Sequence, residues 1–184
     1  MIRLIAGLGN DDRAYHLTFH NVGFHAVETF AARRGWGWRR AKSTLSAGEG
    51  NLALAKPRSY MNVCGPSVKD ALLKAGGDPA SLLVVVDDFM LPEGALRIRR
   101  GGSSGGHNGL KSIIETLGTE GFARVRIGVG PVPPGVDPAD YVLHRVAAGR
   151  LEAAAEKAAD AIEVCLSDGL EKAMNAFNKK PEAA

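Results

Sequence analysis

Residues 82–88 read LLVVVDD, five apolar residues followed at once by two carboxylates. A short, continuous apolar run rich in valine is typical of a strand that is buried on both faces in the middle of a sheet. We therefore expect a central strand at 82–86, with Asp87 at its end. The rest of the chain has to supply the neighbouring strands and the helices that cover them.

Strand-like and helix-like segments alternate along the rest of the chain. The expected strands lie at 2–9, 52–55, 95–98 and 125–129, and the expected helices at 24–31, 68–75, 110–117 and 146–178, the last broken near 168–169. The proline-rich stretch 131–140 reads as a surface connection. The alternation predicts one α/β domain over residues 1–184, with a mixed central sheet covered by helices on both faces and a flexible tail at 179–184.

The composition restricts the class of protein to which the chain can belong. A chain of 184 residues with 45% hydrophobic and 23% charged residues is typical of a soluble globular domain. No apolar run reaches the roughly 18 to 20 residues that a membrane helix needs, and the N-terminal segment lacks a signal-peptide pattern. The two cysteines, Cys64 and Cys165, lie in apolar helical patterns, which indicates buried free thiols. We expect a cytoplasmic protein that does not contact membranes.

Positive charge is modest overall but unevenly distributed. The net charge is +3 and the pI is about 9.0, a weak indication of an anionic partner. One basic cluster surrounds Trp36 and Trp38. Its members are Arg33, Arg34, Arg39, Arg40 and Lys42. Such a cluster fits nucleic-acid binding and fits a solvated surface equally well.

Two glycine-rich turns invite a nucleotide-binding interpretation, but neither completes a motif. GLGNDD at 7–12 has an aspartate in place of the third glycine of a dinucleotide fingerprint. The glycine loop, residues 101–109, lacks the Gly-Lys-Ser/Thr of a P-loop, so we expect no nucleotide cofactor. A zinc pair at His16 and His20 has helical spacing but lacks the glutamate of H-E-x-x-H.

A serine esterase is a further alternative. GSSGG at 102–106 matches the G-x-S-x-G elbow that would present Ser104 as a nucleophile. Asp137 or Asp140, followed by His144, completes a triad order. The pattern arises easily in glycine-rich loops, and it leaves the histidine and asparagines of the first half of the chain without a role.

Polar residues stand at the ends of the expected elements. They are Asn10, His20, Asn21, Asn62, Asp87 and Asn108. Taken singly, each asparagine is more simply a helix N-cap, which satisfies a free backbone N–H. Taken together, these residues form a polar cluster where α/β folds bind ligands. A histidine near an aspartate is a general base with an orienting partner, and a pKa near 6.5 suits the activation of water.

Five segments, in their order and spacing, resemble the bacterial peptidyl-tRNA hydrolase family. They are GLGNDDRAYHLTFHNVG (7–23), KPRSYMN (56–62), VDDFMLPEG (86–94), GGHNGLKSI (105–113) and RVRIGVG (124–130). The resemblance implies an enzyme that hydrolyses the ester between a peptide and the terminal ribose of tRNA. It implies no metal and no cofactor, peptidyl-tRNA as the partner, and a monomer.

The resemblance also implies roles for the matching residues. His20 is the expected general base, and Asp87 orients it and stabilises its charged form. Asn10 is expected to hold the site and to help distinguish a blocked amino group from a free one. The expected contacts with the substrate are Tyr15, Asn21, Tyr60, Met61, Asn62 and Asn108.

Basic residues and the C-terminal segment complete these expectations. Arg99 and Arg126 stand where the family grips the 5′ phosphate end of the tRNA. His107 is expected to support the glycine loop and to matter less than Asn108. Residues 146–178 are either a lid near the cleft, as the family suggests, or a helix that packs on the core.

The chain departs from the family pattern at four places. Asp11-Asp12 replaces Pro-Gly, Phe19 replaces an arginine, Val86 replaces a histidine and Met90 replaces an aspartate. We expect Phe19 and the two aspartates to weaken contact with RNA near the cleft and to leave the chemistry intact. The remaining alternative is an RNA-binding protein of the same fold without catalysis, against which the presence of His20 and Asp87 argues.

Overall fold

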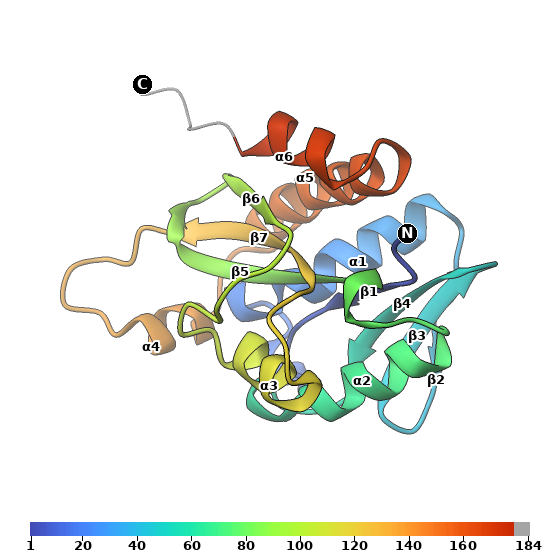
Figure 1. The fold of residues 1–184 in the computed structure, drawn as a ribbon. Helices are drawn as coiled ribbons and strands as arrows, with labels where there is room; N and C mark the ends of the chain where they lie inside the picture. Colours follow the sequence, from blue (N-terminus) through green and yellow to red (C-terminus); the bar gives the residue numbers. More distant parts are fainter. Residues whose placement is uncertain (179–184) are drawn as a thin grey trace.

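The structure is a computed structural model that describes residues 1–178, so the predicted flexible tail at 179–184 lies outside the described residues. A seven-stranded mixed sheet runs through the molecule in the order β2–β3–β4–β1–β5–β7–β6, with helices on both faces (Figure 1). The predicted fold class is therefore confirmed. No helix within the described range is long and apolar enough to cross a membrane.

Four parallel strands form the middle of the sheet. They are β4 (Leu52–Pro57), β1 (Leu4–Gly7), β5 (Leu82–Pro92) and β7 (Ala123–Gly130). Antiparallel strands flank them: β3 (Thr44–Glu49) and the short β2 (Arg39–Arg40) beyond β4, and β6 (Leu96–Arg99) beyond β7. The run 82–86 thus lies at the centre, between β1 and β7.

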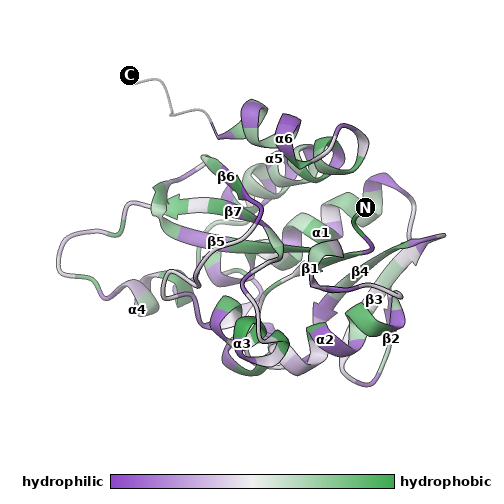
Figure 2. Cartoon of the chain, in the orientation of Figure 1, coloured by the Kyte–Doolittle hydropathy of each residue, from purple (hydrophilic) through white to green (hydrophobic). Residues whose placement is uncertain are grey.

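Helices cover the two faces of the sheet unequally. The first face carries α1 (Val22–Arg33), α5 (Ala148–Ser167) and α6 (Leu170–Phe177), and the second carries α2 (Gly65–Lys74) and α3 (Asn108–Leu117). Alternate residues of β5 enter the two apolar clusters, Leu83 and Val85 on the first face and Val84 and Val86 on the second. All four are fully buried, which explains why this strand shows no polar alternation. Hydrophobic residues run along the central strands and the helices that cover them (Figure 2).

The structure differs from the expected elements in three places. The strand predicted at 82–86 continues to Pro92, because pairing with β7 extends past the apolar run. The strand β3 was not predicted, since its sequence TLSAGE contains little β-branched or aromatic character. The helix α4 (Pro138–Leu143) begins inside the predicted connection at 131–140, where Asp137 accepts the N–H groups of the first turn.

The C-terminal segment forms two helices that break at the predicted position. The helix α5 packs against α1, and α6 packs against β6. Asn178 donates to and accepts from the backbone of Ile98, which satisfies a residue of the edge strand β6. These contacts make the segment part of the core packing in the structure, and not a lid over the site.

A glycine lets α1 approach the sheet closely. A Cβ atom on Gly23 would lie 2.3 Å from the carbonyl oxygen of Val85 and 2.7 Å from the backbone nitrogen of Leu8. Any side chain there would push the helix away from β1 and β5. The close approach matters because His20 lies in the turn that leads into α1, and Asp87 lies on β5.

Candidate active site

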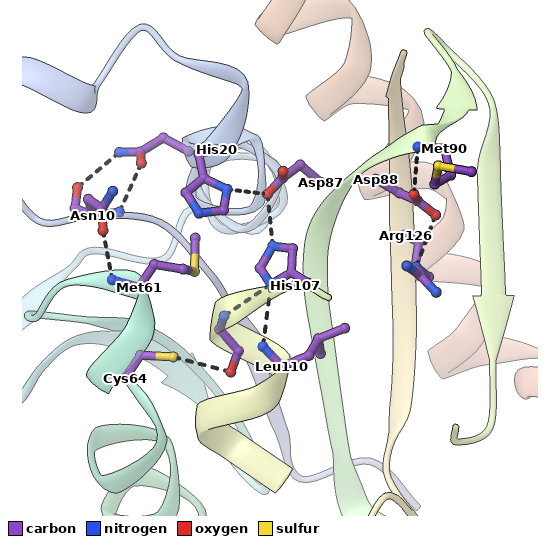
Figure 3. Close-up of polar contacts among 12 residues, drawn as sticks. Asn10, His20, Met61, Cys64, Asp87, Asp88, Met90, His107, Leu110 and Arg126 are labelled. Carbon is purple, nitrogen blue, oxygen red and sulfur yellow. Dashed lines mark hydrogen bonds and ion pairs between the residues drawn. The ribbon is translucent and has the colours of Figure 1, made fainter. Parts of the chain in front are cut away.

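His20 and Asp87, 67 positions apart in the sequence, meet at one edge of the sheet. The Nδ1 atom of His20 lies 2.9 Å from Oδ1 of Asp87 (Figure 3). The aspartate is 3% exposed, and a carboxylate that is so deeply buried is stable only when hydrogen-bond donors reach it. With Nδ1 donating to the carboxylate, Nε2 of His20 carries the free lone pair. The predicted histidine–aspartate pair is thus present with the tautomer that a general base needs.

His107 contacts the same carboxylate oxygen. Its Nε2 lies 3.0 Å from Oδ1 of Asp87, and its Nδ1 accepts the backbone N–H groups of Gly109 and Leu110 (Figure 3). Because Nδ1 is an acceptor, Nε2 must carry the proton and donate it to the aspartate. His107 is therefore the N-cap of α3 and also a second donor to Asp87. The expectation that it only supports the glycine loop missed this contact.

The shared carboxylate changes the acid–base properties of the pair. Burial would lower the pKa of His20, but the charge and the hydrogen bond of Asp87 outweigh it and raise that pKa above 6.5. Burial would raise the pKa of Asp87, but the charge of His20 and the hydrogen bonds of both histidines hold it far below its ordinary range. Asp87 therefore stays ionised whenever the fold is intact, and His20 is a stronger base than a free imidazole.

Asn10 and Asn21 form a second buried unit beside the pair. The backbone N–H of Asn10 donates to Oδ1 of Asn21 at 2.8 Å, and Nδ2 of Asn21 donates back to the Asn10 carbonyl at 3.0 Å. Oδ1 of Asn10 accepts the N–H of Met61 at 2.7 Å (Figure 3). Among the described residues, Nδ2 of Asn10 has no protein partner, so it is available to a substrate.

Asn21 therefore has a different contact from the one expected. It occupies the N-cap position of α1, yet its side chain makes no capping bond and is 2% exposed. It holds the turn that carries Asn10 and does not reach outward to a substrate. Met61 is likewise buried, at 4% exposed, and packs in the apolar cluster under α2 and α3.

Other predicted substrate residues lie at the surface. Asn62 and Asn108 are exposed and make no side-chain hydrogen bond within residues 1–178, and Tyr60 is 59% exposed. Tyr15 is half-buried at the end of a short turn. Arg99 is exposed on the edge strand β6. These side chains are exposed or partly exposed and are therefore accessible to a ligand.

The sequence analysis did not single out two charged residues of the site, Asp88 and Arg124. Asp88, the neighbour of Asp87, forms an ion pair with Arg126 on β7 (Figure 3). Arg124 is 1% exposed and donates to four backbone carbonyls, which tie the glycine loop to the turn before β7. The signal was available: consecutive aspartates on a strand must face opposite sides, and each then needs its own partner.

The departures from the family pattern have local explanations. Phe19 is 2% exposed, and its ring contacts Tyr141 and lies under the guanidinium of Arg150. It is a core residue and offers no contact to a ligand, and the expected weakening of RNA contact by the loss of an arginine here stays a prediction. Asp12 caps the turn that follows it, and Asp11 lies 3.3 Å from Arg58.

The other two departures face opposite environments. Val86 is fully buried under α2 and α3, where a histidine would need a polar partner. Met90 is 76% exposed, and its backbone N–H donates to Asp88.

The structure does not assemble the serine triad. Ser104 accepts the N–H of Gly106, and the Nδ1 of His144 contacts the backbone of Asp140. The zinc pair does not form either. The ring of His16 stacks on His25 with centroids 4.8 Å apart, and His20 points to Asp87.

Among the described residues, His20, Asp87 and His107 are the one group of side chains with the spacing of metal ligands. Their ligand atoms lie within 4.8 Å of one another. In this arrangement both imidazoles are hydrogen-bonded to one carboxylate oxygen, and the Nδ1 atom of His107 is occupied by backbone N–H groups. The three side chains therefore satisfy one another as a hydrogen-bonded unit.

The surface hollows differ in their relation to this unit. A hollow of about 520 Å³ is lined by Asn10 and Asn21, and one of about 400 Å³ by Arg58 and Tyr60. A larger hollow, about 1030 Å³, lies around Trp36, near the edge of the sheet that β2 and β3 form. We place the active site beside the hollow that Asn10 lines, because Asn10 lies next to the His20–Asp87 pair (Figure 3). Arg33 and Arg34 of the basic cluster pair with carboxylates of α5, which favours the surface interpretation for these two.

An α/β sheet that presents a histidine hydrogen-bonded to a buried, ionised aspartate, with free amide donors beside it, has the groups that a hydrolase without a covalent intermediate uses. A family model described as peptidyl-tRNA hydrolase matches residues 4–184. The chain is 46% identical to a peptidyl-tRNA hydrolase of Chloroflexus aggregans and 44% identical to that of Chloroflexus aurantiacus, with 95% of this chain and 98% of each relative covered. The crystal structure of peptidyl-tRNA hydrolase from Acinetobacter baumannii has a TM-score of 0.87 at 30% identity, covering 99% of this chain and 97% of that one. The chain belongs to the peptidyl-tRNA hydrolase family and is an enzyme of that class.

Proposed function

We propose that the chain hydrolyses the ester between a peptide and the terminal ribose of tRNA, with His20 as the general base. One observation carries the assignment of this role. Nδ1 of His20 is hydrogen-bonded to the buried, ionised Asp87, which leaves a lone pair on Nε2, and the pKa of His20 is raised. A carboxylic ester is reactive enough to be attacked by a water molecule that such a base deprotonates.

The reaction follows from the protonation states. Nε2 of His20 takes a proton from water as the water oxygen attacks the ester carbonyl, and the negative charge of Asp87 stabilises the imidazolium that forms. The tetrahedral intermediate then collapses, the bond to the ribose oxygen breaks, and His20 returns its proton to that oxygen. The products are a peptide with a free carboxylate and a tRNA with a free hydroxyl.

Amide donors are suited to the charge that develops on the ester oxygen. Nδ2 of Asn10 is unpaired among the described residues and is held in place by the bond between Oδ1 and Met61. Asn62, in the turn before α2, and Asn108, at the start of α3, add exposed amides. Such neutral donors, fixed before the reaction, stabilise an oxyanion without a metal.

The test of the function is release of an acyl amino acid. The protein is incubated with N-acetyl-aminoacyl-tRNA, and free N-acetyl-amino acid is measured over time. We expect multiple turnovers. Binding of the tRNA without turnover would support the alternative, an RNA-binding protein of the same fold, and would overturn the proposal. A cytoplasmic location is part of the proposal, supported by the two free, buried cysteines, and the monomeric state stays a prediction.

Phosphate contacts are the expected role of Arg99 and Arg126. We predict that Arg99→Glu or Arg126→Gln raises KM for full-length N-acetyl-aminoacyl-tRNA roughly tenfold, because a charge-assisted contact with a phosphate is lost. KM for a short 3′-end mimic should not change. The difference should shrink as salt is added, because counterion release drives phosphate binding. Arg40→Gln on β2, at the opposite edge of the sheet, is the control for net charge. Equal losses on both substrates would place the two arginines elsewhere in the mechanism.

A further inference from the structure

Asp88 is a second buried carboxylate at the site, and the hydrolytic steps do not use it. Because successive side chains of a strand face opposite sides, Asp87 faces His20 and Asp88 faces Arg126 (Figure 3). Asp88 is 6% exposed. Its Oδ2 lies 3.0 Å from Nε of Arg126, and its Oδ1 accepts the backbone N–H of Met90 at 2.9 Å. The carboxylate is therefore held by its own strand while it faces the arginine.

Arg126 is pressed against the glycine loop at its other end. A Cβ on Gly105, whose φ is +57°, would lie 3.0 Å from Nη2 and 3.5 Å from Nη1 of Arg126. A side chain at this position would have to displace the guanidinium, and the positive φ itself favours glycine. Within residues 1–178, neither terminal nitrogen of Arg126 has a hydrogen-bond partner. The ion pair with Asp88 thus lies on the Nε side of the guanidinium, where Nε itself makes no hydrogen bond, and Nη1 and Nη2 remain available as donors.

Like charges surround this arginine. The register of β6 and β7 pairs Arg97 with Arg126 and Arg99 with Arg124, so all four side chains leave the same face of the sheet. Burial and the charge of Arg126 lower the pKa of Arg124, which reflects their mutual repulsion. In the described part of the chain, Asp88 is the only carboxylate that forms an ion pair with any of the four.

We propose that Asp88 is a positioning residue for the substrate: it holds Arg126 against Gly105 so that the two terminal nitrogens of the guanidinium face a phosphate of the tRNA. The inference rests on the proposed function and assigns a task to a residue that does not touch the ester. Without Asp88, repulsion from the neighbouring arginines would turn Arg126 away from the glycine loop. A bidentate contact with a phosphate needs the guanidinium plane to be fixed beforehand.

A purely electrostatic role makes the opposite prediction. If Asp88 only neutralised Arg126, its removal would make the surface more positive and would tighten the binding of an anionic RNA. If Asp88 positions Arg126, its removal weakens binding although the net charge becomes more favourable. The sign of the change therefore separates the two roles.

The test uses Asp88→Asn in the full chain. Steady-state kcat and KM are measured with N-acetyl-aminoacyl-tRNA that carries its 5′ phosphate and with a short 3′-end mimic. We expect KM for the tRNA to rise roughly 3- to 10-fold, with kcat and both constants for the mimic unchanged. Asp160→Asn on α5 carries the same change in net charge and should leave all four constants unchanged.

A double-mutant cycle identifies the route of the effect. On an Arg126→Gln background, Asp88→Asn should add nothing, because the group that it positions is gone. A fall in KM for the tRNA, or equal losses of kcat on both substrates, would overturn the proposal. An additive loss on the Arg126→Gln background would do the same. Wild-type turnover of the tRNA substrate is measured in parallel, so failure of the proposed function is recognised separately.

Discussion

Replacing His20 with alanine is expected to lower kcat for N-acetyl-aminoacyl-tRNA by roughly 100- to 10,000-fold, the usual contribution of a positioned general base. KM should change little, because the imidazole acts on the water and not on the tRNA. The side chain is only 9% exposed, so its loss also leaves Asp87 with one donor where it had two. Single-turnover assays with saturating enzyme measure the chemical step directly.

A second histidine provides the matched control. His25 lies on α1, its Nε2 contacts the backbone of His16, and it touches neither Asp87 nor Asn10. The His25→Ala variant should keep wild-type kcat. Thermal unfolding of both variants shows whether the fold is intact. Undiminished turnover by folded His20→Ala would show that His20 is not the general base.

Periodicity predicted the central elements of the fold but missed those whose stability comes from neighbours. The run at 82–86 needs burial on both faces, and that requirement alone places it mid-sheet. The strand β3 is different: TLSAGE has weak strand propensity, and it becomes a strand because β4 offers it a complete antiparallel partner. The continuation of β5 through Asp87 and Asp88 was also missed. Two consecutive aspartates normally indicate the end of a strand in a sequence. Here their backbone pairs with β7, and their side chains are satisfied by His20 and Arg126.

The site could be predicted by residue type and only partly by contact. The resemblance selected His20, Asp87 and Asn10, and the structure brings these close to one another in two hydrogen-bonded units. It could not show that Asn21 faces inward, or that His107 reaches Asp87. Both facts depend on side-chain direction at the start of a helix, which sequence spacing does not determine. The sequence can therefore identify the residue at which a helix begins, but not the group that its side chain contacts.

Two histidines on one carboxylate oxygen have unequal electrostatic consequences. His107 donates a hydrogen bond from Nε2 to Asp87 and has no free nitrogen, since two backbone N–H groups occupy Nδ1. His20 donates one hydrogen bond from Nδ1 and keeps the lone pair on Nε2. The aspartate is therefore held in position by the start of α3 while its negative charge acts on the base. This arrangement links the glycine loop, through His107, to the basicity of His20.

The Asp87→Asn variant should lose roughly 100-fold or more in kcat, because the imidazolium formed in the transition state loses its counter-charge. It should also change the pH dependence. In the wild type, kcat/KM falls as the pH drops through the raised pKa of His20, above 6.5, since the protonated imidazole cannot accept a proton. Without the carboxylate only the effect of burial remains, which lowers the pKa. The acid limb of the profile is therefore expected to move to lower pH.

Stability provides a readout of the same pair that does not depend on activity. The pKa of His20 is raised in the folded state, so the stabilisation from its protonation is fully present below the unfolded value of 6.5 and is lost as the pH rises through the folded value. Denaturant unfolding of the wild type should show this gain in unfolding free energy on acidification, whereas Asp87→Asn should not. The difference between the two curves isolates the pair from other titrating groups. Parallel curves, together with an unmoved acid limb, would mean that Asp87 does not set the basicity of His20.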